Sequence, residues 1–293
     1  MTLLRSVIIT AVLVAGISGA AQATPFFTQD PRTLPQGMWR IEEHLLLTDF
    51  DESLVDGHEA PLLGGHSASS LTVNTRLRYG VRDDLTVFAD IPYVRKRLQA
   101  TDGATRTNDG LGDVFLLAKC KVHDDRRSKT RAAVAAATKL KTGEYHSLPP
   151  ELALGTGQTS WLIAGLAEKQ VGRTTYYASA SHVWTGTRHD TDLNPGQVVN
   201  LNLAAEHSLG PGSWAAAAEI NCSHQGKSRQ NRQRVEASGT TLVNLAGGFQ
   251  YRPRPRAGRT IVIEAEVQVP VHTEGYARTL PDAVFYLGAY IIF

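Results

Sequence analysis

The chain has 293 residues, and its 30 Lys and Arg residues against 28 Asp and Glu residues give a formal net charge of +2 at pH 7. This balance argues against nucleic acid as a partner, because a nucleic-acid-binding protein carries a basic face or stripe. Beyond the first 23 residues no run of about 18 apolar residues occurs, so the sequence excludes a helical membrane span.

The N-terminus has the pattern of a secretory signal peptide. A short positive start precedes the apolar stretch Ser6–Ile17, and Ala21 and Ala23 supply the small residues that a signal peptidase requires. As a transmembrane helix this stretch is short. We therefore expect residues 1–23 to be a cleaved signal peptide and residues 24–293 to form one exported domain.

About twelve segments of this domain alternate apolar and polar residues with the period of two that defines a β-strand, and none has a convincing helical period. In chain order the expected strands are Gly37–Thr48, Leu71–Val81, Leu85–Val94, Gly112–Val122, Ala132–Leu140, Thr159–Val171, Thr174–Thr185, Val199–Leu209, Ser213–Ser223, Thr241–Arg252, Thr260–Val271 and Leu280–Phe293.

The second segment shows the alternation most clearly. One face is apolar throughout, whereas the other carries Arg76 and Arg78. An Arg pair inside a continuous strand must face water, and a fully apolar opposite face is what lipid requires. This strand therefore favours a membrane barrel over a soluble sandwich, which is the alternative for an all-β chain.

The connections between the expected strands alternate in length, which favours an up-and-down barrel with a periplasmic and an extracellular rim. An even number of strands also leaves both termini on the periplasmic side. The short connections are Arg82–Asp84, His123–Arg131, Gly172–Arg173, Gly210–Gly212 and Pro253–Arg259. The longer, polar ones are Asp49–Ser70, Arg95–Leu111, Lys141–Gln158, Gly186–Val198, Gln225–Thr240 and, shorter than the others, His272–Thr279.

The last segment ends the chain on an aromatic residue, Phe293, after strict apolar alternation. This ending resembles the terminal signal of outer-membrane barrels, so we expect the barrel-assembly machinery to bind it. Tryptophan placement agrees with a girdle at each membrane interface. Trp39 and Trp214 open strands at the expected periplasmic rim, and Trp161 and Trp184 lie near the opposite rim.

The charged residues on the inner faces of the expected strands are sorted by sign. Twelve strands predict a narrow lumen, and a basic wall opposite an acidic wall would orient polar solutes within it. Alternatively, these side chains pair into a salt-bridged plug or only solvate the interior. The candidate pore-lining residues are Arg76, Arg78, Lys119, Lys121, Lys139, Lys141, Glu206, Glu219, Glu264 and Glu266.

Other chemistry is sparse, and the sequence predicts no catalytic, cofactor-binding or metal-binding residues. Cys120 and Cys222 occupy alternating apolar positions of distant strands, so we expect two free thiols on the outer face. His58 and His66 lack the spacing of a metal site, and no Gly-x-Ser-x-Gly nucleophile motif occurs. The basic loop residues 227–234 could contact lipopolysaccharide phosphates.

Three stretches resemble the outer-membrane family named for the MetA-pathway of phenol degradation. They are Leu77–Val87 continuing to Ile91–Val94, then Gly110–Val114, and then Leu154–Trp161. The family's Pro-Thr-Gly after the fifth strand is replaced here by Lys141-Thr142-Gly143. The resemblance implies a transporter-like barrel and, from the family's name, uptake of aromatic compounds.

Together these features predict a closed antiparallel outer-membrane β-barrel of about twelve strands that lets small solutes, with aromatic compounds among the candidates, pass without a cofactor. Its other expected partners are outer-membrane lipid and lipopolysaccharide. A non-conducting structural or surface-interaction barrel is the main alternative, and a barrel enzyme that acts on lipid is a weaker one.

Overall fold

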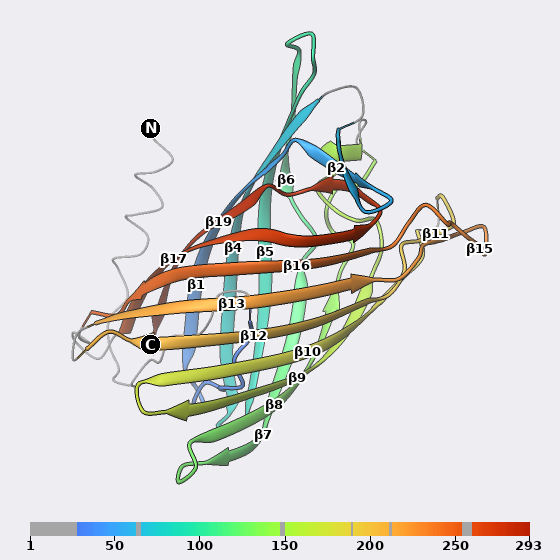
Figure 1. Ribbon diagram of the computed structural model, residues 1–293. Helices are drawn as coiled ribbons and strands as arrows, with labels where there is room; N and C mark the ends of the chain where they lie inside the picture. The colour runs from blue at the N-terminus through green and yellow to red at the C-terminus, as the bar shows by residue number, and fades with distance from the viewer. Residues whose placement is uncertain (1–27, 63–65, 147–149, 189, 211–212, 254–259) are drawn as a thin grey trace.

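The computed structural model describes residues 28–62, 66–146, 150–188, 190–210, 213–253 and 260–293, so the expected signal peptide lies outside the described residues. These residues form a closed antiparallel barrel of twelve strands, as the alternation predicts (Figure 1). The strands, in their order around the ring, are β1 (Trp39–Phe50), β4 (Ser67–Arg82), β5 (Leu85–Gln99), β7 (Phe115–Asp125), β8 (Thr130–Lys139), β9 (Ser160–Val171), β10 (Thr174–Thr185), β12 (Val198–Ser208), β13 (Trp214–Gln225), β16 (Thr240–Tyr251), β17 (Thr260–Gly275) and β19 (Ala283–Ile292).

The ring is closed by pairing of its first and last strands. β19 pairs with β1 from Arg40↔Ile292 to Asp49↔Ala283. Beyond the strand, the backbone amide of Trp39 donates to the carbonyl of Phe293 at 2.9 Å, and the amide of Phe293 donates back at 3.0 Å. Closure leaves no unpaired strand edge, which is the condition for crossing hydrocarbon with a sheet.

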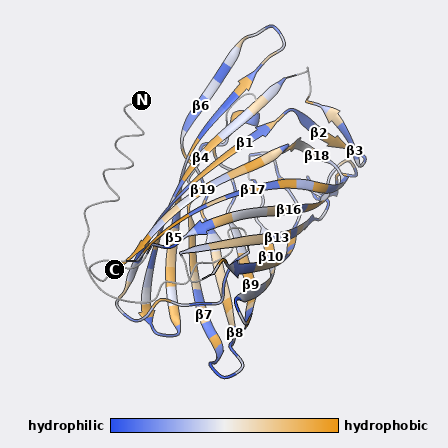
Figure 2. Cartoon of the chain, turned by 60° about the vertical axis from the view of Figure 1, so that its left-hand side comes forward, coloured by the Kyte–Doolittle hydropathy of each residue, from blue (hydrophilic) through white to orange (hydrophobic). Residues whose placement is uncertain are grey.

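Successive residues of each strand face opposite sides of the sheet, and the two faces differ in chemistry (Figure 2). On β19, Phe285 and Leu287 are 49% and 50% exposed on the outer face, whereas Tyr286 and Tyr290 are buried on the inner face. The outward direction predicted for the apolar residues of this strand is therefore confirmed. No helix among the described residues has the length and apolar character of a membrane-spanning helix.

The two rims differ as the connection lengths predict. Tight turns, such as the one at Gly172–Arg173, join strands at one end, which we call the short-turn rim. Two residues of the expected turn Gly210–Gly212 and six of Pro253–Arg259 lie outside the described residues. The opposite end, the long-loop rim, carries several short elements. They are β2 (Glu52–Val55), β3 (His58–Pro61), β6 (Thr105–Leu111), η1 (Pro150–Leu152), β11 (Leu193–Asn194), β14 (Arg229–Gln230), β15 (Gln233–Arg234) and β18 (Ala277–Leu280).

Some strands extend beyond their expected bounds. β4 begins at Ser67 rather than Leu71, and β5 runs to Gln99 rather than Val94. The extra residues pair with each other, and β6 adds to the far end of β5. Most of these residues are Ser, Arg or Lys, which is why apolar alternation could not mark them as strand.

The aromatic residues lie at both rims. At the short-turn rim the Trp39 ring is 4.7 Å from that of Tyr79 and the Trp214 ring 4.8 Å from that of Tyr251. At the long-loop rim Trp161 is 61% exposed on the outer face. The positions match the two interfacial girdles of a membrane barrel. The two cysteines of the described residues are free and half-buried.

Candidate functional site

The described residues that precede β1 begin at Thr28 and run through the inside of the barrel without forming a strand. We call Thr28–Gln36 the lumen segment. At its start, the backbone amide and the hydroxyl of Thr28 both donate to Glu219 Oε2 on β13, each at 2.8 Å. Near its end, the amide of Leu34 donates to Thr86 Oγ1 on β5 at 2.8 Å. Because β5 and β13 lie six strands apart in a ring of twelve, the segment joins opposite walls.

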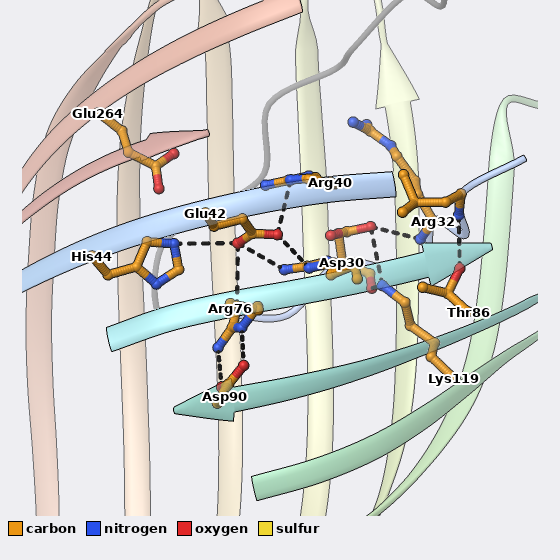
Figure 3. Close-up of polar contacts among 12 residues, drawn as sticks. Asp30, Arg32, Arg40, Glu42, His44, Arg76, Thr86, Asp90, Lys119 and Glu264 are labelled. Atoms are coloured by element: carbon orange, nitrogen blue, oxygen red, sulfur yellow. Dashed lines mark hydrogen bonds and ion pairs between the residues drawn. The ribbon is translucent and has the colours of Figure 1, made fainter. Parts of the chain in front are cut away.

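Each of the two charged residues of the lumen segment, Asp30 and Arg32, meets an opposite charge on a strand, and Figure 3 shows this for Asp30 and Lys119. Lys119 Nζ on β7 donates to the carbonyl oxygen of Asp30 at 2.8 Å and lies 3.6 Å from its Oδ1. Arg32 Nε lies 2.8 Å from Glu168 Oε2 on β9, and Arg32 Nη2 donates to the hydroxyl of Tyr177 at 3.0 Å. The segment thus supplies an anion to Lys119 on β7 and a cation to Glu168 on β9.

Asp30 lies outside the membrane-spanning strands but is only 4% exposed. Burial alone would raise the pKa of its carboxyl group, because it disfavours the charged form. The positive charges of Lys119, Arg78, Arg32 and Arg40 outweigh burial and lower the pKa below its ordinary value. Asp30 is therefore an ionised group whose charge is matched by its surroundings.

A single carboxylate, that of Glu42 on β1, organises the basic wall. Glu42 Oε1 lies 2.8 Å from Arg40 Nε and also pairs with Arg78, while Oε2 lies 3.7 Å from Arg76 Nη1 and 3.2 Å from His44 Nε2. Glu42 is 1% exposed. Three guanidinium groups therefore share one buried carboxylate, and the cluster needs further anions nearby. Arg76 has a second one in Asp90 of β5, through hydrogen bonds of 2.5 and 2.6 Å.

A glycine allows the lumen segment to pass close to the wall on its way into β1. A Cβ at Gly80 of β4 would lie 2.0 Å from the carbonyl oxygen of Pro35 and 2.8 Å from that of Leu34. The same glycine bonds the chain through its backbone, since its carbonyl accepts from the amide of Gly37 at 2.8 Å and its amide donates to the carbonyl of Met38 at 3.0 Å. A side chain at this position would displace the segment.

The six basic residues proposed to line the pore lie in four different places. On the inner face, Lys139 lies 3.4 Å from Asp113 Oδ2. Lys121 pairs with Asp124 at the short-turn rim, at 3.1 Å. Lys141 follows the end of β8 and is exposed. The structure brings the remaining three together beside the lumen segment and Glu42: Arg76, Arg78 and Lys119.

The four acidic candidates are at most 5% exposed on inner faces, but their partners differ. Glu206 pairs with Arg252 of the segment after β16. Glu264 Oε1 accepts from the hydroxyl of Tyr286 at 2.6 Å. Among the residues that the structure describes, neither oxygen of Glu266 has a hydrogen-bond partner. The four residues are Glu206, Glu219, Glu264 and Glu266.

Sequence reasoning missed several residues that hold the lumen together: Asp30, Arg32, Glu42, Glu168 and Arg252. The signal for Glu42 was present, because Arg40, Glu42 and His44 alternate with Ile41 and Leu45 along one strand. Asp30 and Arg32 belong to no periodic segment, so periodicity could not place them. Within the described part of the chain, no three His, Cys, Asp or Glu residues are grouped as metal ligands.

A family model described as "Putative MetA-pathway of phenol degradation" matches residues 56–280. The chain belongs to this family. The matched range includes the three stretches that carry the resemblance and ten complete strands of the ring, from β4 to β17. No curated protein sequence matches the chain.

A solved structure shows the same fold. The COG4313 outer membrane channel from Pseudomonas putida F1 has a TM-score of 0.78 at 15% identity, and the match covers 93% of this chain and 100% of that one. The Ralstonia pickettii toluene transporter TbuX matches at a TM-score of 0.44 and 11% identity, over 90% of this chain and 92% of that one. The match to the COG4313 channel shows that the fold of this chain is that of an outer-membrane barrel.

Proposed function

We propose that the protein is an outer-membrane channel for the passive passage of small solutes. One observation carries this proposal: the barrel is closed, its outer face is apolar, and its interior is lined by polar and charged side chains. Lipid requires the closed ring and the apolar outer face, and a polar interior is typical of barrels with water inside. Passage through such an interior needs no cofactor.

The lumen segment makes this channel a gated or partly obstructed one. It crosses the interior between β13 and β5 and is held by ion pairs to β7 and β9. Solutes must pass beside it or displace it. The candidate pore-lining residues thus act in two ways in this proposal: Lys119 and Glu219 hold the segment, whereas Lys139 lies on the inner face and pairs with Asp113.

The family description supports aromatic compounds as candidate solutes. The sequence alone suggested a wall of unpaired cations, which fits poorly with aromatic solutes. In the structure the cations of this basic wall are paired with Glu42, Asp90 and Asp30, which fits such solutes better. A neutralised wall does not attract anions over long distances as a free basic wall would.

We further propose that residues 1–23 are a cleaved export signal and that the mature domain begins at residue 24. In this proposal the barrel-assembly machinery binds the C-terminal strand through Phe293. The basic residues 227–234, which lie at the long-loop rim, would contact lipopolysaccharide phosphates. Lys227 already pairs with Glu236 there, so part of this charge is internally matched.

The second candidate is a non-conducting structural or surface-interaction barrel. It is favoured by the lumen segment itself, since two buried ion pairs and several backbone hydrogen bonds hold it across the interior. A barrel enzyme acting on lipid has no comparable support, and we propose no catalytic residues.

Single-channel recording in a planar bilayer separates the two candidates. A channel gives steady ion current, and Lys139→Glu shifts its selectivity towards cations because a negative charge replaces a positive one on the inner face. Lys129→Glu, in the exposed turn between β7 and β8, is the matched control and leaves selectivity unchanged. A purified, folded barrel that carries no current under any condition supports the non-conducting alternative instead.

A further inference from the structure

The lumen contains a cavity of about 300 Å³ whose described lining residues are all uncharged. The lining residues come from β9, β10, β12, β13, β16 and β17, and from Gln29 of the lumen segment. β12 begins at the long-loop rim, and Asn200 and Asn202 are the third and fifth of its residues. The cavity therefore lies on the long-loop side of the lumen, which is the outer side in an outer-membrane barrel.

One wall of this cavity, which we call the amide wall, is built from paired amides and hydroxyls. Asn200 Nδ2 donates to Ser181 Oγ at 3.0 Å, and Asn202 Nδ2 donates to Ser179 Oγ at 3.1 Å. These bonds orient the side chains and use one amide hydrogen each. The amide wall therefore retains carbonyl oxygens that can accept hydrogen bonds and serine hydroxyls that can donate them.

The adjoining side of the cavity, which we call the apolar wall, is built from Leu162, Ala164 and Leu166 of β9, the strand that pairs with β10. These residues belong to a larger apolar cluster on the inner faces of β5, β7, β8 and β9, which includes Phe88 and Leu117. An apolar cluster inside a membrane barrel is not required by lipid, because lipid contacts only the outer face. It gives the cavity a surface on which the apolar part of a solute can pack.

Gln29 separates this cavity from the charged cluster, because it lines both spaces. On its other side lie Asp30, Arg40, Glu42 and Lys119. The cavity thus ends on the lumen segment, and the segment keeps the charges of the basic wall away from it.

We propose that this cavity binds a small uncharged solute with a hydroxyl or carbonyl group attached to an apolar body. The apolar body packs on the apolar wall, and the polar group bonds to the amide wall. An ion is disfavoured because it would lose water without meeting an opposite charge. This inference rests on the proposed function only for the direction in which the solute moves, which is from the long-loop rim towards the lumen segment.

The test uses two alkylating probes of matched size that differ in charge, uncharged iodoacetamide and anionic iodoacetate. Both are applied to the Asn202→Cys variant in a Cys120→Ser, Cys222→Ser background. The same background with Ala104→Cys, at the exposed tip of the β5–β6 hairpin, is the control. We expect the rate ratio of iodoacetamide to iodoacetate to be about tenfold larger at position 202 than at position 104, because only the cavity disfavours the charged probe.

Protection by a bound solute gives the second measurement. Benzyl alcohol should slow the reaction of iodoacetamide with the Asn202→Cys variant, and benzoate, a carboxylate of similar size, should not. Neither should slow the reaction of the Ala104→Cys variant. Equal rate ratios at the two positions, or equal protection by benzoate, would overturn the proposal.

A folding check accompanies both measurements, since Asn202 bonds to Ser179. Where the variant does not fold, saturation-transfer NMR on the unmodified protein compares benzyl alcohol with benzoate directly, and a signal that is not larger for benzyl alcohol overturns the proposal. Binding is independent of conduction: a barrel that conducts but does not bind benzyl alcohol refutes this inference and leaves the channel intact. A barrel that binds benzyl alcohol but carries no current supports this inference and refutes the proposed channel function.

Discussion

Among the described residues of the basic wall, Glu42 is the carboxylate with the most cationic partners. Arg40, Arg76 and Arg78 all lie within ion-pair distance of it. Breaking a buried ion pair by neutralising one partner leaves the other as an uncompensated charge, at a cost of about 3–5 kcal/mol. We expect Glu42→Gln to lower the free energy of unfolding by about 3 kcal/mol or more, measured by thermal or denaturant unfolding in detergent.

The adjacent residue provides the control. Glu43 lies on the outer face of the same strand, and its oxygens accept a hydrogen bond from Thr75 rather than facing a cation. Glu43→Gln keeps that hydrogen bond and should change the unfolding free energy by less than about 1 kcal/mol. Equal losses in the two variants would show that Glu42 does not hold the basic wall.

Asp30 makes the seating of the lumen segment dependent on pH. Its pKa is lowered in the seated state, so its contribution to seating is complete above the ordinary carboxyl value of about 3.9 and is lost as the pH falls through the lower, seated value. We expect the segment to stay seated from pH 5 to 8 and to loosen in acid. Protease accessibility of residues 28–36 against pH measures this, and Asp30→Asn should remove the acid transition.

At the scale of the element, the lumen segment is held by side chains rather than by a strand ladder. Its charged contacts to β7 and β9 come from two residues, Asp30 and Arg32. The double variant Asp30→Asn, Arg32→Ala should loosen the segment and raise single-channel conductance several-fold, because the seated segment crosses the lumen. The pair Arg82→Ala, Asp84→Asn, in the short turn between β4 and β5, removes an exposed ion pair outside the lumen and should leave conductance unchanged.

The last strand yields a separate prediction about assembly. Phe293 bonds to Trp39 through backbone atoms only, so these hydrogen bonds survive loss of the aromatic ring. We expect Phe293→Ala to reduce the amount of barrel in the outer membrane several-fold while the purified variant still closes and melts like the original. Phe285→Ala, on the outer face of the same strand, is the control with an unaltered terminus. Normal membrane amounts for Phe293→Ala would remove the proposed role of the terminal ring.

The strands could be predicted because one physical constraint acts on all of them: each must present one apolar face to lipid. Leu71–Val81 and Leu280–Phe293 show this constraint clearly, and both contain a strand of the ring, although the last one begins at Ala283 because Leu280 belongs to β18. The extension of β5 to Gln99 could not be predicted, because Arg95, Lys96 and Arg97 lie where pairing continues without apolar alternation.

At the scale of the whole molecule, closure predicts a barrel that resists unfolding as a unit. The twelve strands are joined in a ring by uninterrupted antiparallel pairing, so no strand can leave without breaking two ladders. We expect extraction from membranes to require detergent, and the unheated protein to migrate differently from the heated protein on a gel. A protein that dissolves in periplasmic extract without detergent would contradict the membrane assignment.

The interior was less predictable than the wall. The alternation of each strand placed Lys119 and Glu219 on inner faces, but it could not show that both bind the same stretch of chain. That relation depends on contacts between residues 89 and 191 positions apart. Periodicity describes one strand at a time, whereas the lumen is built from many strands and from a segment with no period.

The position of the lumen segment also constrains the order of assembly. Its partners on β5, β7, β9 and β13 come from sequence positions as far on as residue 219, and they surround it only when the sheet has curved round. The lumen segment is the first part of the chain that the structure describes, yet it is therefore among the last parts to form its contacts. A seated lumen segment therefore shows that the whole ring of strands has closed. The pairing of Lys119 with Asp30 can serve as a reporter of a fully assembled barrel.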